Sequence, residues 1–173
     1  DSIQNAVNDA AGGTPGVVLV AQGTFVYSGG ATDQYGYIID AIEDVSLYGS
    51  FSDEDWDKRD VTVYPTILQD TRTTSNGSQS TASPYRVINI AAGISSATIL
   101  DGFEIWIAPI TGGPSTPSAC AFFISNASPV IRNNIIRSYD IINGSSVNIM
   151  GIRLITGGNP QISNNIINLG SMT

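Results

Sequence analysis

The sequence contains no histidine and only one cysteine, Cys120. Histidine is the commonest metal ligand and the commonest general base near neutral pH. Its absence excludes histidine-ligated zinc hydrolases and enzymes that use a Ser-His-Asp triad. A single cysteine cannot form a disulfide within the chain. Carboxylates, amides, hydroxyls, aromatic rings and a few cations remain as the groups on which a function can rest.

Basic residues are scarce as well. Seven Lys and Arg face fifteen Asp and Glu, which gives a net charge of −8 and a pI near 4.1. Because binding to nucleic acid needs basic groups that displace phosphate counterions, we expect no nucleic-acid partner. No apolar run approaches the ~18 residues of a membrane helix, so we expect no membrane span. Abundant Gly, Asn, Ser and Thr beside Ile and Val favour a turn-rich β protein.

The length of 173 residues predicts one domain over residues 1–173. Residues 1–12 have the apolar spacing of an amphipathic helix, with Ser2 or Asp1 as its N-cap and Gly12 at its end. Short apolar runs separated by Gly, Asn, Asp and Pro follow, as expected for strands. The predicted strands are 17–20, 37–42, 45–48, 86–90, 98–100, 103–107, 121–124, 130–131 and 151–155.

Residues 121–137 and 152–168 repeat one pattern: an apolar run, a turn, a proline, and an Asn-Asn pair followed by Ile-Ile. Their prolines, Pro129 and Pro160, are 31 residues apart. A weaker copy has Asp101-Gly102 in place of the first Asn-Asn pair. Repeats made of short strands and turns, without a helix, predict a β-solenoid whose coils stack about 4.8 Å apart.

The coils of this solenoid are expected over residues 17–169. A side chain that points inward at a bend is best satisfied by the equivalent side chain one coil away. The predicted ladder of this kind consists of Asp101, Asn133 and Asn164. The alternative is that the Asx pairs form turns in unrelated hairpins.

Several stretches carry a family resemblance: SIQNAVNDAA and GVVLVAQGTF near the start, VSLYGSF, DKRD and YPTIL further on, and TILDGFEI with the Asn-Asn repeats. They resemble the N-terminal part of right-handed parallel β-helix proteins of the pectin-lyase-like superfamily, in particular its secreted or surface-exposed bacterial members. The resemblance implies an all-β, right-handed parallel β-helix with a short N-terminal capping helix, located outside the cell or on its surface.

Members of that superfamily usually have more coils and a C-terminal cap. The sequence ends soon after its second Asn-Asn pair, so we expect a fragment that lacks this cap. Its last coil would then expose unpaired strand edges and part of the core. End-to-end self-association through this coil is the expected consequence.

Aromatic residues lie in or beside the longer segments between strands, which we expect to emerge from one corner of the solenoid. These segments are 27–36, 52–85, 108–118 and 138–148. Exposed rings stack on the C–H faces of sugars, while carboxylates and amides bind the hydroxyls. The candidate glycan-binding residues are Trp56, Tyr85, Glu104, Trp106 and Tyr139. Alternatively, the rings anchor their loops to the solenoid wall.

The segment 52–60 contains the densest cluster of charge in the chain. Its alternating Asp53, Asp55 and Asp57 offer oxygen ligands for a calcium ion, the only cofactor that the sequence suggests. In the alternative interpretation, Arg59 forms an ion pair with Asp57 or Asp60 and holds the loop in place.

Taken together, these patterns predict a non-catalytic, secreted or cell-surface scaffold that binds a polysaccharide or surface glycan through its loops. The alternative is the N-terminal part of a carbohydrate-active enzyme, either a polysaccharide lyase or a glycoside hydrolase, and a self-assembling fibre module is a third possibility. Neither two paired carboxylates nor a catalytic pattern of the superfamily is present, so we assign no catalytic residue.

Overall fold

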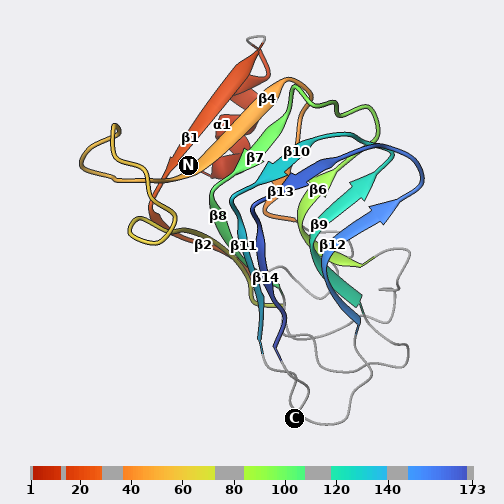
Figure 1. Ribbon diagram of the computed structural model, residues 1–173. Coiled ribbons are helices and arrows are strands. Elements are labelled where there is room, and N and C mark those ends of the chain that lie inside the picture. Colours follow the sequence, from red (N-terminus) through yellow and green to blue (C-terminus); the bar gives the residue numbers. More distant parts are fainter. Residues whose placement is uncertain are drawn as a thin grey trace.

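The computed structural model describes residues 2–12, 15–28, 37–72, 84–107, 118–139 and 148–170. The helix α1 (Ile3–Ala10) begins after Ser2, whose hydroxyl oxygen accepts a hydrogen bond from the backbone N–H of Asn5 at 3.2 Å. Its buried residues, Ile3 and Val7, join the hydrophobic core at the first strands (Figure 1). The predicted N-terminal helix is confirmed. No helix in the described part of the chain has the length and hydropathy that a membrane crossing requires.

The strands form three parallel sheets. Sheet A has the order β1-β4-β7-β10-β13, sheet B has the order β2-β5-β8-β11-β14, and sheet C has the order β3-β6-β9-β12. The strands are β1 (Gly16–Ala21), β2 (Gly23–Tyr27), β3 (Ile39–Asp40), β4 (Val45–Phe51), β5 (Thr66–Asp70), β6 (Tyr85–Ile90), β7 (Ile99–Asp101), β8 (Phe103–Ile107), β9 (Ser118–Ser125), β10 (Val130–Arg132), β11 (Ile135–Ser138), β12 (Asn148–Ile155), β13 (Gln161–Ser163) and β14 (Ile166–Asn168).

Successive strands visit the sheets in a fixed rotation, from A to B to C. We call each such triplet a coil: coil 1 is β1 to β3, coil 2 is β4 to β6, coil 3 is β7 to β9, and coil 4 is β10 to β12, while β13 and β14 begin coil 5. The colours of Figure 1 run from red to blue along the stack in this order. The prediction of a mostly β protein with parallel sheets is confirmed, and the arrangement is compatible with a parallel solenoid.

The core consists of aliphatic columns that run along the stack. In sheet A, Leu47 pairs with Leu100 and Leu100 with Ile131, and all three side chains are fully buried. Sheet B has a matching column of Leu68, Ile105 and Ile136. Each buried aliphatic side chain stabilises the fold by roughly 1.5–3 kcal/mol. The columns therefore hold successive coils in one register.

The predicted ladder of Asp101, Asn133 and Asn164 is confirmed only for its first step, where Asn133 Nδ2 donates to Asp101 Oδ1 at 3.1 Å, and a second ladder lies one residue further along the chain. Arg132 pairs with Asp101, which places Asn133 beside Gly102 and Asn134 beside Phe103. Gly102 and Asn133 have positive φ angles of 80° and 56°, and this turn directs the next residue inward. This second ladder joins the fully buried Asn134 to the partly buried Asn165, while Asn133 and Asn164 lie in the turn with positive φ and Asp101 is buried beside Arg59 and Arg132.

The segment 52–65 is an insertion between sheets A and B, and it projects to the left in Figure 1. Arg59 fixes it to the stack by an ion pair with Asp101 of coil 3 at 2.6 Å and by a hydrogen bond to the carbonyl of Gly49 at 2.8 Å. The expected partners Asp57 and Asp60 are therefore wrong. The carboxylate of Asp60 instead accepts a hydrogen bond from the Thr62 hydroxyl at 2.6 Å.

The described part of coil 5 is more exposed than the coils before it. Ile162 and Ile167 continue the inward columns of sheets A and B, yet they are 48% and 49% exposed. No described strand pairs with β13 or β14 on their outer side. Self-association through this end stays a prediction.

Candidate functional site

The outer face of sheet B carries the candidate site. Along β8, the side chains of Phe103, Ile105 and Ile107 are buried, while those of Glu104 and Trp106 are only partly buried. This alternation is the period-2 pattern of a strand with one face in the core. Glu104 and Trp106 therefore point away from the core.

Pairing between coils extends this outer face along the stack. Trp106 pairs with Gln69 on one side and with Arg137 on the other, and Arg137 pairs with Asn168. Adjacent strands lie about 4.8 Å apart. A continuous row of one aromatic and three polar side chains therefore follows the stack axis.

Trp106 and Tyr139 form an aromatic pair at this row. Their ring centroids are 5.2 Å apart and the rings are tilted by 50°. Tyr139 follows β11, and its hydroxyl accepts a hydrogen bond from the side-chain amide of Gln69. This bond connects coil 4 to coil 2, so the Tyr139 ring is held over coil 3.

The carboxylate of Glu104 fixes the opposite side of the indole. One oxygen, Oε1, accepts hydrogen bonds from Trp106 Nε1 at 2.8 Å and from Arg137 Nε at 2.9 Å. The Arg137 guanidinium also lies 5.9 Å from the centroid of the indole. The polar edge of the indole and the charge of Arg137 are therefore both satisfied within the protein.

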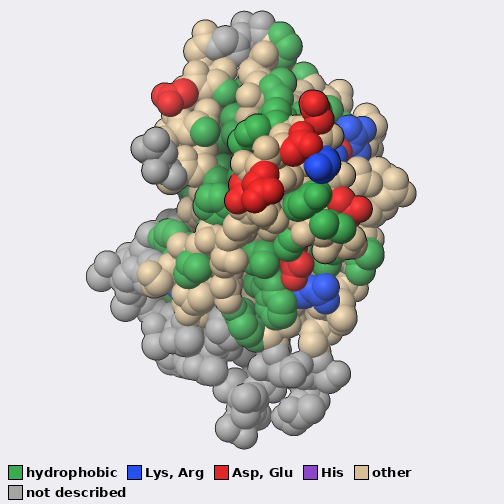
Figure 2. Space-filling view, turned by 90° about the vertical axis from the view of Figure 1, so that its left-hand side faces the viewer, with side chains coloured by type: hydrophobic (Ala, Val, Ile, Leu, Met, Phe, Trp, Pro, Cys, Tyr) green, Lys and Arg blue, Asp and Glu red, His purple; other side chains and the backbone are tan. Residues whose placement is uncertain are grey.

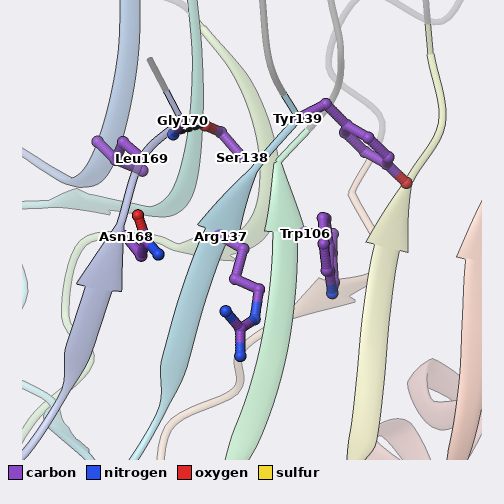
Figure 3. A pocket seen from close by; sticks show the side chains of 7 residues that line it. All are labelled: Trp106, Arg137, Ser138, Tyr139, Asn168, Leu169 and Gly170. Atoms are coloured by element: carbon purple, nitrogen blue, oxygen red, sulfur yellow. Dashed lines mark hydrogen bonds between the residues drawn. The ribbon is translucent and has the colours of Figure 1, made fainter.

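These side chains surround a hollow of about 430 Å³. Its described lining residues are Trp106, Arg137, Ser138, Tyr139, Asn168, Leu169 and Gly170. Figure 3 shows Trp106, Arg137 and Asn168 side by side on three neighbouring strands, with the Tyr139 ring above Trp106. The wall is fixed by a hydrogen bond from the Gly170 N–H to the Ser138 hydroxyl at 2.8 Å. Small-molecule pockets span about 300–1,000 Å³, so this hollow has room for a small organic ligand.

The structure brings together three of the five predicted glycan-binding residues: Glu104, Trp106 and Tyr139. It does not place Trp56 with them. Trp56 is 50% exposed and packs on Phe51 of β4, with 5.9 Å between the ring centroids. Trp56 therefore anchors the 52–65 insertion to sheet A while leaving one side of its ring in solvent.

The glycan interpretation requires Tyr85 to lie on the surface, but the structure buries it. Only 2% of it is exposed, and its ring lies 4.1 Å from the Arg72 guanidinium carbon. Arg72 is itself buried and paired with Asp70. Tyr85 is therefore part of the interior packing between sheets B and C, and we remove it from the candidate site.

The predicted calcium ligands do not converge. Asp53 accepts a hydrogen bond from Gln22 at 2.5 Å, and Asp55 pairs with Lys58 at 3.1 Å. No three acidic side chains within the described ranges gather into a group that could hold a metal ion. On the face shown in Figure 2, acidic side chains are interspersed with basic and apolar ones. Asp53 and Asp55 are therefore engaged with other side chains, and calcium binding by Asp53, Asp55 and Asp57 stays a prediction.

Most of the segments predicted to share a corner do connect sheet B to sheet C, but 52–65 connects sheet A to sheet B. Residues 29–36, 73–83, 108–117 and 140–147 lie outside the described residues. The candidate site is instead formed mainly by strand residues and by the first residues after β11 and β14.

Sequence reasoning did not assign Gln69, Arg137 and Asn168 to the site. The information was present, because Trp106, Arg137 and Asn168 follow each other at intervals of 31 residues, as the two prolines do. The repeat alignment placed Asp101 opposite Asn133, an interval of 32 residues. With that interval, Trp106 does not align with Arg137, so the alignment did not reveal that these residues lie on one face. A correct register would have aligned the three residues on one face.

This arrangement suits binding better than covalent chemistry. Glu104, beside the hollow, already accepts two internal hydrogen bonds, and no carboxylate is among the described residues that line the hollow. Acid–base hydrolysis of a glycoside normally needs two carboxyl groups about 5–10 Å apart. Trp106 and Tyr139, by contrast, are both partly exposed and line the hollow.

Comparisons of the chain with protein-family models, with curated proteins and with solved structures found no match. The resemblance to the pectin-lyase-like superfamily therefore depends on the sequence stretches and on the parallel three-sheet architecture described above.

Proposed function

We propose that this protein is a non-catalytic scaffold, secreted or displayed at the cell surface, that binds glycan on the outer face of sheet B. The observation that carries this proposal is the Trp106–Tyr139 pair, whose rings border a hollow that is otherwise lined largely by polar groups. Sugar rings present apolar C–H faces and polar edges. A site with flat aromatic faces beside amide and hydroxyl groups complements both.

The hydrogen bonds of the site support this assignment. Trp106 donates its N–H to Glu104, and Tyr139 uses its hydroxyl to bind Gln69. Both rings are therefore held in fixed positions before a ligand arrives. Preorganised rings lose little conformational entropy on binding, which favours affinity for a weakly polar surface.

The proposed fold is the right-handed parallel β-helix of the pectin-lyase-like superfamily, capped by α1 at its N-terminal end. The rotation of strands through three parallel sheets supports it, as does the strong preference of parallel crossovers for the right-handed sense. A rigid stack of coils presents strand residues at fixed spacing, which suits a scaffold. The location outside the cell follows from the resemblance.

The alternative function is that of the N-terminal part of a polysaccharide lyase or glycoside hydrolase. No specific observation among the described residues favours it. We therefore propose the binding function rather than the enzymatic one.

Retention on immobilised polysaccharides tests the proposal. Wild type should be retained, and Trp106→Ala should lose at least about 1.4 kcal/mol of binding free energy, a tenfold weakening. Trp56→Ala removes the chain's other tryptophan, which lies outside the hollow, and should bind as wild type does. Equal retention of wild type and Trp106→Ala, or no retention of wild type on any polysaccharide, would contradict the proposal.

A further inference from the structure

We infer that the glycan bound at this site is uncharged, so the site selects neutral sugar chains over chains that carry carboxylates or sulfates. This inference depends on the proposed glycan-binding function and adds the chemical class of the ligand. It follows from the charges around the hollow.

Arg137 is the only charged residue among the described residues that line the hollow. Its Nε lies 2.9 Å from Glu104 Oε1, and the Glu104 side chain is only 15% exposed. A cation that is matched by a partly buried carboxylate leaves no net charge for an anionic ligand to neutralise. An acidic sugar would approach Arg137 only with Glu104 close by, and repulsion from that carboxylate would oppose binding.

The remaining polar lining is neutral. Asn168 offers a carboxamide and Ser138 a hydroxyl, while Trp106, Tyr139, Leu169 and Gly170 add apolar surface or backbone groups. Amides and hydroxyls both donate and accept hydrogen bonds, so they match sugar hydroxyls. They provide no strong site for a carboxylate or sulfate.

The charge of the whole chain acts in the same direction. With a net charge of −8, the protein repels polyanions at long range, and low ionic strength increases this repulsion. A site evolved for an acidic polymer would need a local excess of cations to overcome it. The described lining has none beyond the matched Arg137.

The hollow also limits the ligand to a short stretch of sugar chain. It crosses β8, β11 and β14 of sheet B (Figure 3), which is two steps of the stack, or roughly 10 Å. A short oligosaccharide is therefore an adequate probe, and long polymers are not needed for the test.

The experiment measures binding of the whole chain to two oligosaccharide sets by isothermal titration calorimetry. The neutral set contains cello-, xylo- and manno-oligosaccharides, and the acidic set contains oligogalacturonates and oligoalginates. We expect affinity for at least one neutral ligand to exceed that for every acidic ligand by about tenfold or more. Added NaCl should leave the neutral affinity unchanged, because no charge is matched on binding.

Glu104→Gln tests the role of charge directly. Glutamine keeps an oxygen that can accept hydrogen bonds from Trp106 and Arg137 but removes the negative charge. The variant should bind acidic ligands about tenfold better than wild type does. Glu54→Gln in the 52–65 insertion makes the same change to the net charge away from the hollow, and it should leave selectivity unchanged. Circular dichroism and thermal melting confirm that each variant is folded.

Each result has a distinct meaning. Wild type that binds acidic ligands as tightly as neutral ones, or Glu104→Gln that gains no acidic affinity, overturns the inference but leaves glycan binding standing. Wild type that binds neither set overturns the proposed function, and the inference falls with it. Selective binding of neutral ligands that shifts in Glu104→Gln but not in Glu54→Gln supports both.

Discussion

Asn134 and Asn165 stand at the same place in successive coils, and the Asn165 carboxamide oxygen accepts hydrogen bonds from both the backbone N–H and the Nδ2 of Asn134, each at 3.0 Å. The Asn134 oxygen in turn accepts from the backbone N–H of Phe103 at 3.0 Å. The side chains thus replace backbone pairing where the chain bends between sheets A and B. They allow a tight bend without unsatisfied buried groups.

Asn134→Ala should therefore lower the free energy of unfolding by about 3 kcal/mol, because it leaves buried backbone groups of coil 3 without partners. Asn164→Gly is the matched control. Asn164 is an exposed turn residue with φ of 53°, which glycine adopts easily, so this variant should change stability by less than about 1 kcal/mol. Urea unfolding followed by circular dichroism measures both, and equal losses would contradict the ladder.

The environment of Asp101 leads us to expect that the stability of the fold falls in acid. Burial raises its pKa, but hydrogen bonds from Arg59, Arg132 and Asn133 outweigh burial and hold the pKa below its ordinary value. Ionised Asp101 therefore stabilises the fold above about pH 4, the value for an unfolded chain, and this contribution disappears as the pH falls through the folded pKa.

Unfolding free energies measured from pH 6 downward should show this loss in wild type. Asp101→Asn should be less stable at pH 6 and should depend less steeply on pH below about 4. Parallel pH curves for the two proteins would show that Asp101 contributes nothing through its charge.

The buried pair of Asp70 and Arg72 provides a third test. Their side chains are 1% and 4% exposed, and Arg72 Nε donates to Asp70 at 2.9 Å. Burial raises the pKa of Asp70 even with Arg72 beside it. Arg72→Met should destabilise the protein by about 3–5 kcal/mol because it strands a buried carboxyl group.

Adding Asp70→Leu to Arg72→Met should recover much of that loss, because an apolar pair of similar volume has no charge to desolvate. Thermal unfolding of the single and double variants measures the recovery. A double variant that is less stable than Arg72→Met alone would contradict this interpretation.

Cys120 should be unreactive in the native protein. Its thiol is fully buried, and burial raises its pKa to about 12. Since the thiolate is the reactive form, a disulfide reagent such as DTNB at pH 8 should label it only after unfolding in guanidinium. Rapid labelling of the folded protein would show that β9 of sheet C opens readily.

The sequence predicted the coarse fold because its strongest patterns are local. Helix spacing over residues 1–12 and alternation in β8 need no knowledge of neighbours. The strands β2 and β5 are among those that were missed, because they gain their pairing from each other across coils, which the sequence of either strand alone does not reveal. The partner of Arg59 was missed for the same reason, since Asp101 lies 42 residues away in the chain.

The site was predicted only in part, again for a physical reason. Trp106 and Glu104 follow from alternation along one strand. The prediction that Tyr85 binds glycan was wrong, because a tyrosine beside a loop can pack in the interior against a residue such as Arg72 as readily as it can lie exposed on the surface. Arg137 and Asn168 required the correct register between coils, which the shift from Asn133 to Asn134 as the inward residue obscured.

Tryptophan fluorescence provides the most direct test of the central claim, which is that a sugar chain stacks on Trp106. The chain has two tryptophans, so Trp56→Phe leaves Trp106 as the only one. Titration of this variant with the neutral oligosaccharides should give a saturable change in emission intensity and wavelength, with the same affinity that calorimetry gives for wild type. Emission that stays constant while calorimetry detects binding would place the glycan elsewhere and contradict the account.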